Sequence, residues 1–153
     1  ILADQGLSRA LATRVFLPIG FVQLAANLGT GVLFDRVPPR YLLAAAQVLL
    51  ALALLLATLL ADPRLVLAYG ALVGLFQGMS ATITASAFAH YFGRRHLGAI
   101  KGFVTTLSVA GTALGPLVFA FGKDLFGGYD PVLWLCALLP LGVAGAALVV
   151  KPP

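Results

Sequence analysis

The stretch Tyr41–Ala61 reads YLLAAAQVLLALALLLATLLA, and its length and composition decide the fold class. It consists almost entirely of Leu and Ala, and Gln47 is one of its few polar residues. A transmembrane helix needs about 20 predominantly apolar residues, because in lipid every backbone polar group must find a partner within the segment. The stretch therefore predicts a helix that crosses a membrane.

Four further apolar stretches flank this one, so the sequence predicts an all-α polytopic membrane protein with five transmembrane helices. The predicted spans are 15–34, 41–61, 65–88, 98–122 and 132–150. The composition agrees, because only 10% of the residues are charged, whereas a soluble domain carries about 25%. We expect residues 1–13 to be the end of a preceding helix with its outer loop, and residues 14–153 to be a partial transmembrane bundle.

The net charge of +5 comes from basic residues near the ends of the predicted spans, which indicates orientation in the bilayer and no nucleic-acid partner. One side of the membrane receives Arg36, Arg40, Arg94, Arg95, Lys101 and Lys151. The other side receives Arg9, Arg14, Arg64 and Lys123. Cytoplasmic loops carry the excess of Lys and Arg. We therefore expect a multi-pass protein of the inner (plasma) membrane, with loops 35–40 and 89–97 and the C-terminus in the cytoplasm.

The five spans differ in their content of small and polar residues, on which helix packing in lipid depends. Spans 41–61 and 132–150 carry few of them, which predicts peripheral, lipid-facing helices. The other three spans carry polar residues that are candidates for lining a substrate cavity. These candidates are Gln23, Asn27, Gln77, Ser80, Thr84, Thr105, Ser108 and Thr112.

Each of these polar residues has two interpretations. A Ser or Thr hydroxyl can donate to a carbonyl of the preceding turn, so helix packing is the favoured interpretation for the hydroxyls. An amide cannot satisfy itself as easily, and an unpaired amide in hydrocarbon is costly. For Gln23, Asn27 and Gln77, interhelical hydrogen bonding and a substrate cavity therefore remain equally open.

Two stretches resemble the major facilitator superfamily. The first is GVLFDRVPPR, Gly31–Arg40, which is similar to the family signature G-x-L-x-D-R-x-G-R-R, with Pro38 where the signature has Gly. The second is YFGRRHLGAIKG, Tyr91–Gly102, which resembles the region between the tenth and eleventh helices of bacterial members. The closest similarity is to monocarboxylate and oxalate/formate porters. The resemblance covers nearly the whole chain and implies that the five spans are helices 8–12 of a twelve-helix fold.

The resemblance implies a function as a secondary active transporter of a small organic solute, working by alternating access. A monocarboxylate or another small organic anion is one candidate, although Asn27 stands near the position where monocarboxylate porters often carry an Arg. The chain would be an incomplete C-terminal half, whose partners are the lipid bilayer, the solute and the missing N-terminal half. The alternative is a non-transporting assembly or accessory protein derived from a transporter half.

The resemblance also implies a cytoplasmic gate. Its members would be Gly31, Asp35, Arg36, Arg40, Arg94 and Arg95. The other interpretation of Asp35 is a solvated ion pair, worth about 0–1 kcal/mol.

An enzyme would need a nucleophile with a base, or a metal cluster. The chain has one cysteine, Cys136, and the sequence predicts no catalytic residues, no metal site and no cofactor.

Overall fold

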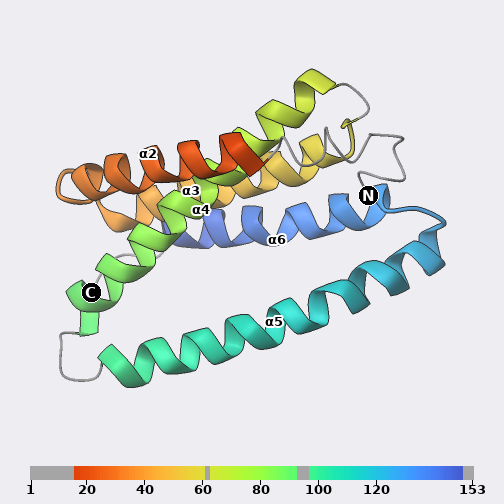
Figure 1. Cartoon of the computed structure of the whole chain (residues 1–153). Coiled ribbons are helices and arrows are strands. Elements are labelled where there is room, and N and C mark those ends of the chain that lie inside the picture. The colour runs from red at the N-terminus through yellow and green to blue at the C-terminus, as the bar shows by residue number, and fades with distance from the viewer. Residues whose placement is uncertain (1–15, 61–62, 93–96, 150–153) are drawn as a thin grey trace.

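The computed structural model describes residues 16–60, 63–92 and 97–149, and the regular structure in these ranges is α-helical. The helices are α2 (Phe16–Phe34), α3 (Pro39–Ala57), α4 (Pro63–Phe92), α5 (Leu97–Phe126) and α6 (Asp130–Val149) (Figure 1). Four of them, α3 to α6, are long and apolar enough to cross a membrane, and α2 carries the shorter apolar stretch Ile19–Phe34. The predicted all-α polytopic fold is confirmed.

The ends of α3 differ from the predicted span 41–61, and local chemistry explains both differences. The helix begins at Pro39, because a proline in the first turn needs no hydrogen-bond partner for its nitrogen. It ends at Ala57, where the Thr58 hydroxyl donates to the carbonyl of Leu55 over 2.7 Å. The amides of Thr58 and Leu59 then donate to carbonyls only three residues earlier, so the α-helical ladder stops.

The apolar stretch of α4, Leu65–Phe88, coincides with the predicted span 65–88. As helices, α4, α5 and α6 begin one or two residues before the predicted spans 65–88, 98–122 and 132–150. Hydropathy marks only the apolar part of a helix, whereas the backbone ladder continues into polar residues beyond the hydrocarbon. The predicted loop 89–97 is therefore shorter, because 89–92 belong to α4 and Leu97 begins α5. Between α5 and α6, Gly127 has a φ of 73° and its amide donates to the carbonyl of Lys123, which is a glycine helix ending.

The helices pack very unequally. Helix α2 lies along α4, and α3 packs against both α4 and α6, whereas α5 contacts α4 and α6 much less (Figure 1). Buried residues form two clusters. The first is Ala57, Leu60, Val66 and Leu133, and the second is Leu42, Ala46 and Ile83.

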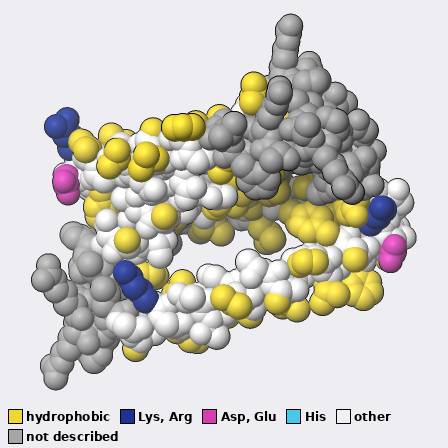
Figure 2. Space-filling model, in the orientation of Figure 1, with side chains coloured by type: hydrophobic (Ala, Val, Ile, Leu, Met, Phe, Trp, Pro, Cys, Tyr) yellow, Lys and Arg dark blue, Asp and Glu magenta, His cyan; other side chains and the backbone are white. Residues whose placement is uncertain are grey.

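The expectation that helices 41–61 and 132–150 are peripheral refers to a complete carrier and stays a prediction; within the described residues, α3 and α6 pack against each other and α5 is the least buried helix. Helix α3 buries an alanine face that includes Ala46, Ala51 and Ala53, and α3 packs against both α4 and α6. Alanine permits close approach of two backbones much as glycine does. No residue of the apolar stretch Gly98–Phe126 in α5 is buried, and Figure 2 shows an opening between α5 and the rest of the bundle.

Candidate functional site

Helices α2 and α4 meet along a glycine seam. A Cβ atom added at Gly78 would lie 2.6 Å from both the Gln23 carbonyl oxygen and the Ala26 Cβ. One added at Gly74 would lie 2.7 Å from the carbonyl oxygen of Ile19. Contacts this short admit no side chain, so the spacing of Gly74 and Gly78 by four residues on one face of α4 is what lets the two backbones approach.

Asn27 on α2 is bonded across this seam. The Thr82 hydroxyl on α4 donates to the Asn27 side-chain oxygen over 3.1 Å and approaches its backbone carbonyl oxygen at 3.3 Å. Asn27 therefore forms an interhelical hydrogen bond, which is one of the two interpretations left open for it. Gln23 contributes its backbone to the same seam and its side chain is half-buried, whereas Gln77 is exposed.

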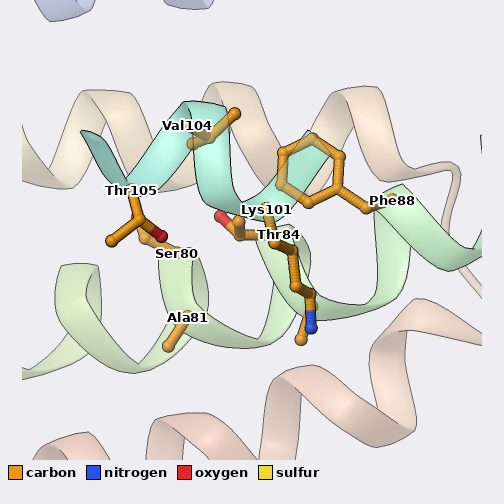
Figure 3. A pocket seen from close by; sticks show the side chains of 8 residues that line it. Ser80, Ala81, Thr84, Phe88, Lys101, Val104 and Thr105 are labelled. Atoms are coloured by element: carbon orange, nitrogen blue, oxygen red, sulfur yellow. The ribbon is translucent and has the colours of Figure 1, made fainter. Parts of the chain in front are cut away.

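A pocket lies between α4 and α5, with a volume of about 380 Å³ (Figure 3). The residues that line it are Ser80, Ala81, Thr84, Ala85, Phe88, Lys101, Val104 and Thr105. Three predicted cavity residues, Ser80, Thr84 and Thr105, therefore come together from two helices. Spacing by four residues explains this, because Ser80, Thr84 and Phe88 share one face of α4, as Lys101 and Thr105 share one face of α5.

Lys101 is the charged residue of the pocket lining, and the sequence indicated for it only a role in orientation. Its position one helical turn before Thr105 is the signal that could have identified it, because the two side chains must share a face. Figure 3 shows Lys101 lying beside Thr84 at the pocket.

Hydrogen bonding separates the hydroxyl groups into two sets. Thr106, Ser108 and Thr112 donate to carbonyls of their own helix, at 3.0, 2.9 and 2.8 Å. Ser108 and Thr112 thus adopt the arrangement favoured for hydroxyls in membrane helices. Within the described residues, the hydroxyls of Ser80, Thr84 and Thr105 form no such bond, and all three face the pocket.

The residues of the predicted gate lie at the end of α2 and the start of α3. Asp35 and Arg36 are exposed, and among the described residues Asp35 forms no ion pair. Arg40 donates to the Tyr41 hydroxyl over 3.1 Å and lies 4.8 Å from the centre of that ring. The predicted partners Arg94 and Arg95 lie outside the described residues.

Charged side chains are confined toward the ends of the bundle on the face that Figure 2 shows, and hydrophobic ones cover its length.

In the described ranges, no group of three or more His, Cys, Asp or Glu side chains could hold a metal ion. The chemistry available in the pocket is thus hydrogen-bond donation from hydroxyls and one ammonium group, beside an apolar wall.

Comparison with known protein families identifies a match. The sequence model of the family described as Major Facilitator Superfamily matches residues 1–153. No curated protein and no solved structure matches the chain.

Proposed function

Because the chain belongs to the Major Facilitator Superfamily, and so is a multi-pass membrane transporter, we propose that it moves a small organic solute by alternating access. The observation that carries this proposal is the pocket between α4 and α5. Its volume of about 380 Å³ is in the range of small-molecule sites, about 300–1,000 Å³. Secondary transporters bind solutes within the membrane, at the interface between repeats that rock against each other.

The unpaired hydroxyls support a solute-binding role for this pocket. A hydroxyl that bonds neither its own helix nor a neighbour keeps its donor and acceptor available to a ligand. Ser80, Thr84 and Thr105 meet this condition within the described residues. Ser108 and Thr112 do not meet it, so we assign them to helix packing.

The loose packing of α5 supports the proposed position of this chain within a carrier. An apolar helix with no buried residue in its span requires lipid or further helices around it. We propose that α2 to α6 correspond to helices 8–12 of a twelve-helix carrier, with a partner half facing α4 and α5. The gene sequence upstream of Ile1 tests this proposal, because a carrier of this kind needs about seven further spans.

We further propose that the end of the bundle carrying Asp35 faces the cytoplasm of a bacterial inner or plasma membrane and forms a gate there. The charge bias supports this orientation, because Arg36, Arg40 and Lys101 all lie toward that end. A gate must make contacts that it can break during the transport cycle. An exposed Asp beside exposed or half-exposed Arg residues is compatible with such contacts.

Solute exchange by the protein expressed from its complete reading frame tests the proposed function. The purified protein would be reconstituted into phosphatidylcholine vesicles and assayed for counterflow with a panel of labelled organic acids, amides and sugars. We expect saturable exchange of at least one solute. Correct insertion without exchange of any of them, together with stable association with a second membrane protein, would instead establish the accessory-protein alternative.

A further inference from the structure

We infer that residues 111–116 form a hinge within α5, about which the N-terminal part of this helix, residues 97–110, moves relative to α4. Residues 97–110 supply one wall of the pocket between α4 and α5, so this motion would open and close the pocket. The inference rests on the proposed transport function, because it assigns a means of controlling access to the proposed solute site. The hinge itself is a property of the helix and is measured without any solute.

The backbone of α5 is weakened at Pro116, which lies inside the helix. Proline has no N–H group, so the carbonyl of Thr112, four residues earlier, loses the donor that an α-helix would give it. Proline is one of the few features at which helices bend sharply. Gly111 and Gly115 precede it and add backbone freedom. A Cβ atom added at either glycine would meet nothing within 4 Å, so packing does not require these two glycines.

Hydroxyl groups perturb the same part of the helix. Those of Thr106 and Ser108 donate to carbonyl oxygens four residues earlier, over 3.0 and 2.9 Å. That of Thr112 donates to the Val109 carbonyl oxygen over 2.8 Å. Hydroxyls bonded in this way compete with the backbone hydrogen bonds of a helix and often bend it. The middle of α5 therefore combines a missing backbone hydrogen bond, flexible glycines and competing hydroxyls.

The C-terminal part of α5 is held in place. Phe119 packs against the first of the two buried clusters. The backbone at Gly122 lies so close to α6 that a Cβ atom added there would collide with the Val132 side chain. At the turn into α6, the Gly127 amide donates to the Lys123 carbonyl oxygen over 2.9 Å. This part of the helix can therefore stay fixed while the other part moves.

The N-terminal part of α5 has no comparable anchor among the described residues. No residue of Gly98–Phe126 is buried, and neither buried cluster involves a residue of 97–110. This part approaches α4 at the pocket, which it lines through Lys101, Val104 and Thr105. Figure 1 shows α5 standing apart from the other helices. Movement of residues 97–110 therefore disrupts little packing, whereas α4, on the other side of the pocket, is held by α2 and α3.

Helix α6 shows that an interior proline alone does not make a hinge. Pro140 lies inside α6, but it is buried, and α6 packs against α3. Packing along a neighbouring helix keeps the two parts of α6 in line although the backbone lacks one donor. Pro116 is exposed, and the helix around it has no such support within the described residues. The combination of a weakened backbone and absent packing thus distinguishes α5.

Helix geometry gives the size of the motion. Lys101 lies about 15 Å along α5 from Gly111, because each residue adds about 1.5 Å. A bend of about 20°, the smallest that counts as sharp, would move Lys101 by about 5 Å. The pocket has a volume of about 380 Å³, so a shift of this size in one wall would change that volume substantially.

Pulsed electron spin resonance measures the hinge as a distance. The protein expressed from its complete reading frame, with Cys136 and any other cysteine replaced by alanine, would be placed in phosphatidylcholine nanodiscs. One spin label at Leu28 marks α2, which packs along α4. A second label is placed at Phe103, before the hinge, or at Leu125, after it; all three side chains are exposed. We expect the Leu28–Phe103 distance to spread over a range about 4 Å wider than the Leu28–Leu125 distance.

This comparison separates a hinge from rigid-body motion of the bundle. If α2 to α6 moved as one body during transport, labels on α2 and α5 would keep their separation, and both distances would be equally narrow. A wider distribution for the label before the hinge alone requires that α5 bends.

Two sets of substitutions assign the wider distribution to residues 111–116. Pro116→Ala restores the missing N–H group and should narrow it to the width of the other pair. The double variant Gly111→Ala/Gly115→Ala should narrow it as well, because alanine has less backbone freedom and both positions have room for a methyl group. Pro140→Ala in α6 is the matched control and should leave the distribution unchanged. If Pro116→Ala does not fold, the double glycine variant decides.

Equal widths for the two label positions in the unaltered protein would overturn the inference, as would a spread that persists in the folded hinge variants. The proposed transport function is measured separately, by exchange in vesicles. Solute exchange with equally narrow distances would retain transport and refute the hinge. A wide distance for the label before the hinge, without exchange of any solute, would retain the hinge and refute transport.

Discussion

The hydroxyl of Thr82 on α4 donates to the side-chain oxygen of Asn27 on α2, with 3.1 Å between the two oxygen atoms. The bond lies beside Gly78, whose missing side chain lets the two helices approach closely enough to form it. Asn27 is thereby engaged in helix packing, whereas the hydroxyls of Ser80 and Thr84, on either side of Thr82 in sequence, face the pocket. One helix thus serves assembly on one face and presents polar groups to the pocket on another.

This bond predicts a measurable coupling between the two residues. Interhelical hydrogen bonds in membranes contribute about 0.6 kcal/mol on average. A double-mutant cycle with Thr82→Val and Asn27→Leu should therefore give a coupling energy of about 0.6 kcal/mol or more in the free energy of unfolding, measured by denaturant titration in mixed micelles. Purely additive effects of the two substitutions would contradict the bond.

The glycine seam predicts that Gly78→Ala destabilises the protein. The new Cβ would meet the Gln23 carbonyl oxygen at 2.6 Å, so α2 and α4 would have to move apart. Overpacking of this kind costs about 1–3 kcal/mol, measurable as a loss in the free energy of unfolding. Gly111→Ala is the matched control, because a Cβ there meets nothing within 4 Å. That variant should lie within about 1 kcal/mol of the unaltered protein. Equal effects of the two substitutions would refute the seam.

The two sets of hydroxyls predict different effects on solute exchange. Thr84→Val and Thr105→Val should each raise the KM about two- to ten-fold, because each removes one neutral hydrogen bond to the solute. Ser108→Ala should leave the KM unchanged, since the Ser108 hydroxyl already donates to the Val104 carbonyl. Initial exchange rates at several solute concentrations measure these constants. An effect of Ser108→Ala equal to that of Thr84→Val would remove the distinction.

The proposed gate predicts that Asp35→Asn slows solute uptake and leaves membrane insertion intact. Loss of an ionic contact that holds the cytoplasmic side closed would lower the population of the outward-open state, which captures solute. Because exposed pairs are worth about 0–1 kcal/mol, we expect a reduction of about two- to five-fold. Asp124→Asn, an exposed acid near the opposite end of the described bundle, is the control. An unchanged rate for Asp35→Asn would dispose of the gate.

The proposed orientation predicts which cysteines are labelled from each side of the membrane. In a Cys136→Ala background, Asp35→Cys should react with a membrane-impermeant maleimide only from the cytoplasmic side, and Asp124→Cys only from the outer side. Acidic residues contribute little to the charge bias that sets topology, so neither substitution should reverse it. Labelling of spheroplasts and of inverted vesicles measures this. The opposite pattern would invert the proposed topology.

Several features could be predicted from the sequence because they depend on residues close together in the chain. The span Tyr41–Ala61 has one stable option in lipid, which is a helix that satisfies its own backbone. The turn at Gly127 and the helix start at Pro39 follow equally from local backbone restrictions. That Gly74 and Gly78 lie on one face of α4 could also be predicted, because residues spaced by four share a face of a helix.

The tertiary structure decided which of these faces meet. The polar residues of α4 and α5 look alike in sequence, yet Thr105 faces the pocket while Ser108 bonds its own backbone. Lys101 became a pocket residue only because α4 and α5 lie side by side at that end. Likewise, α3 packs through alanines that hydropathy treats as lipid-facing. Backbone hydrogen bonding and hydrophobicity are local properties and therefore readable from the chain, whereas the pairing of helix faces depends on shape complementarity between segments distant in sequence.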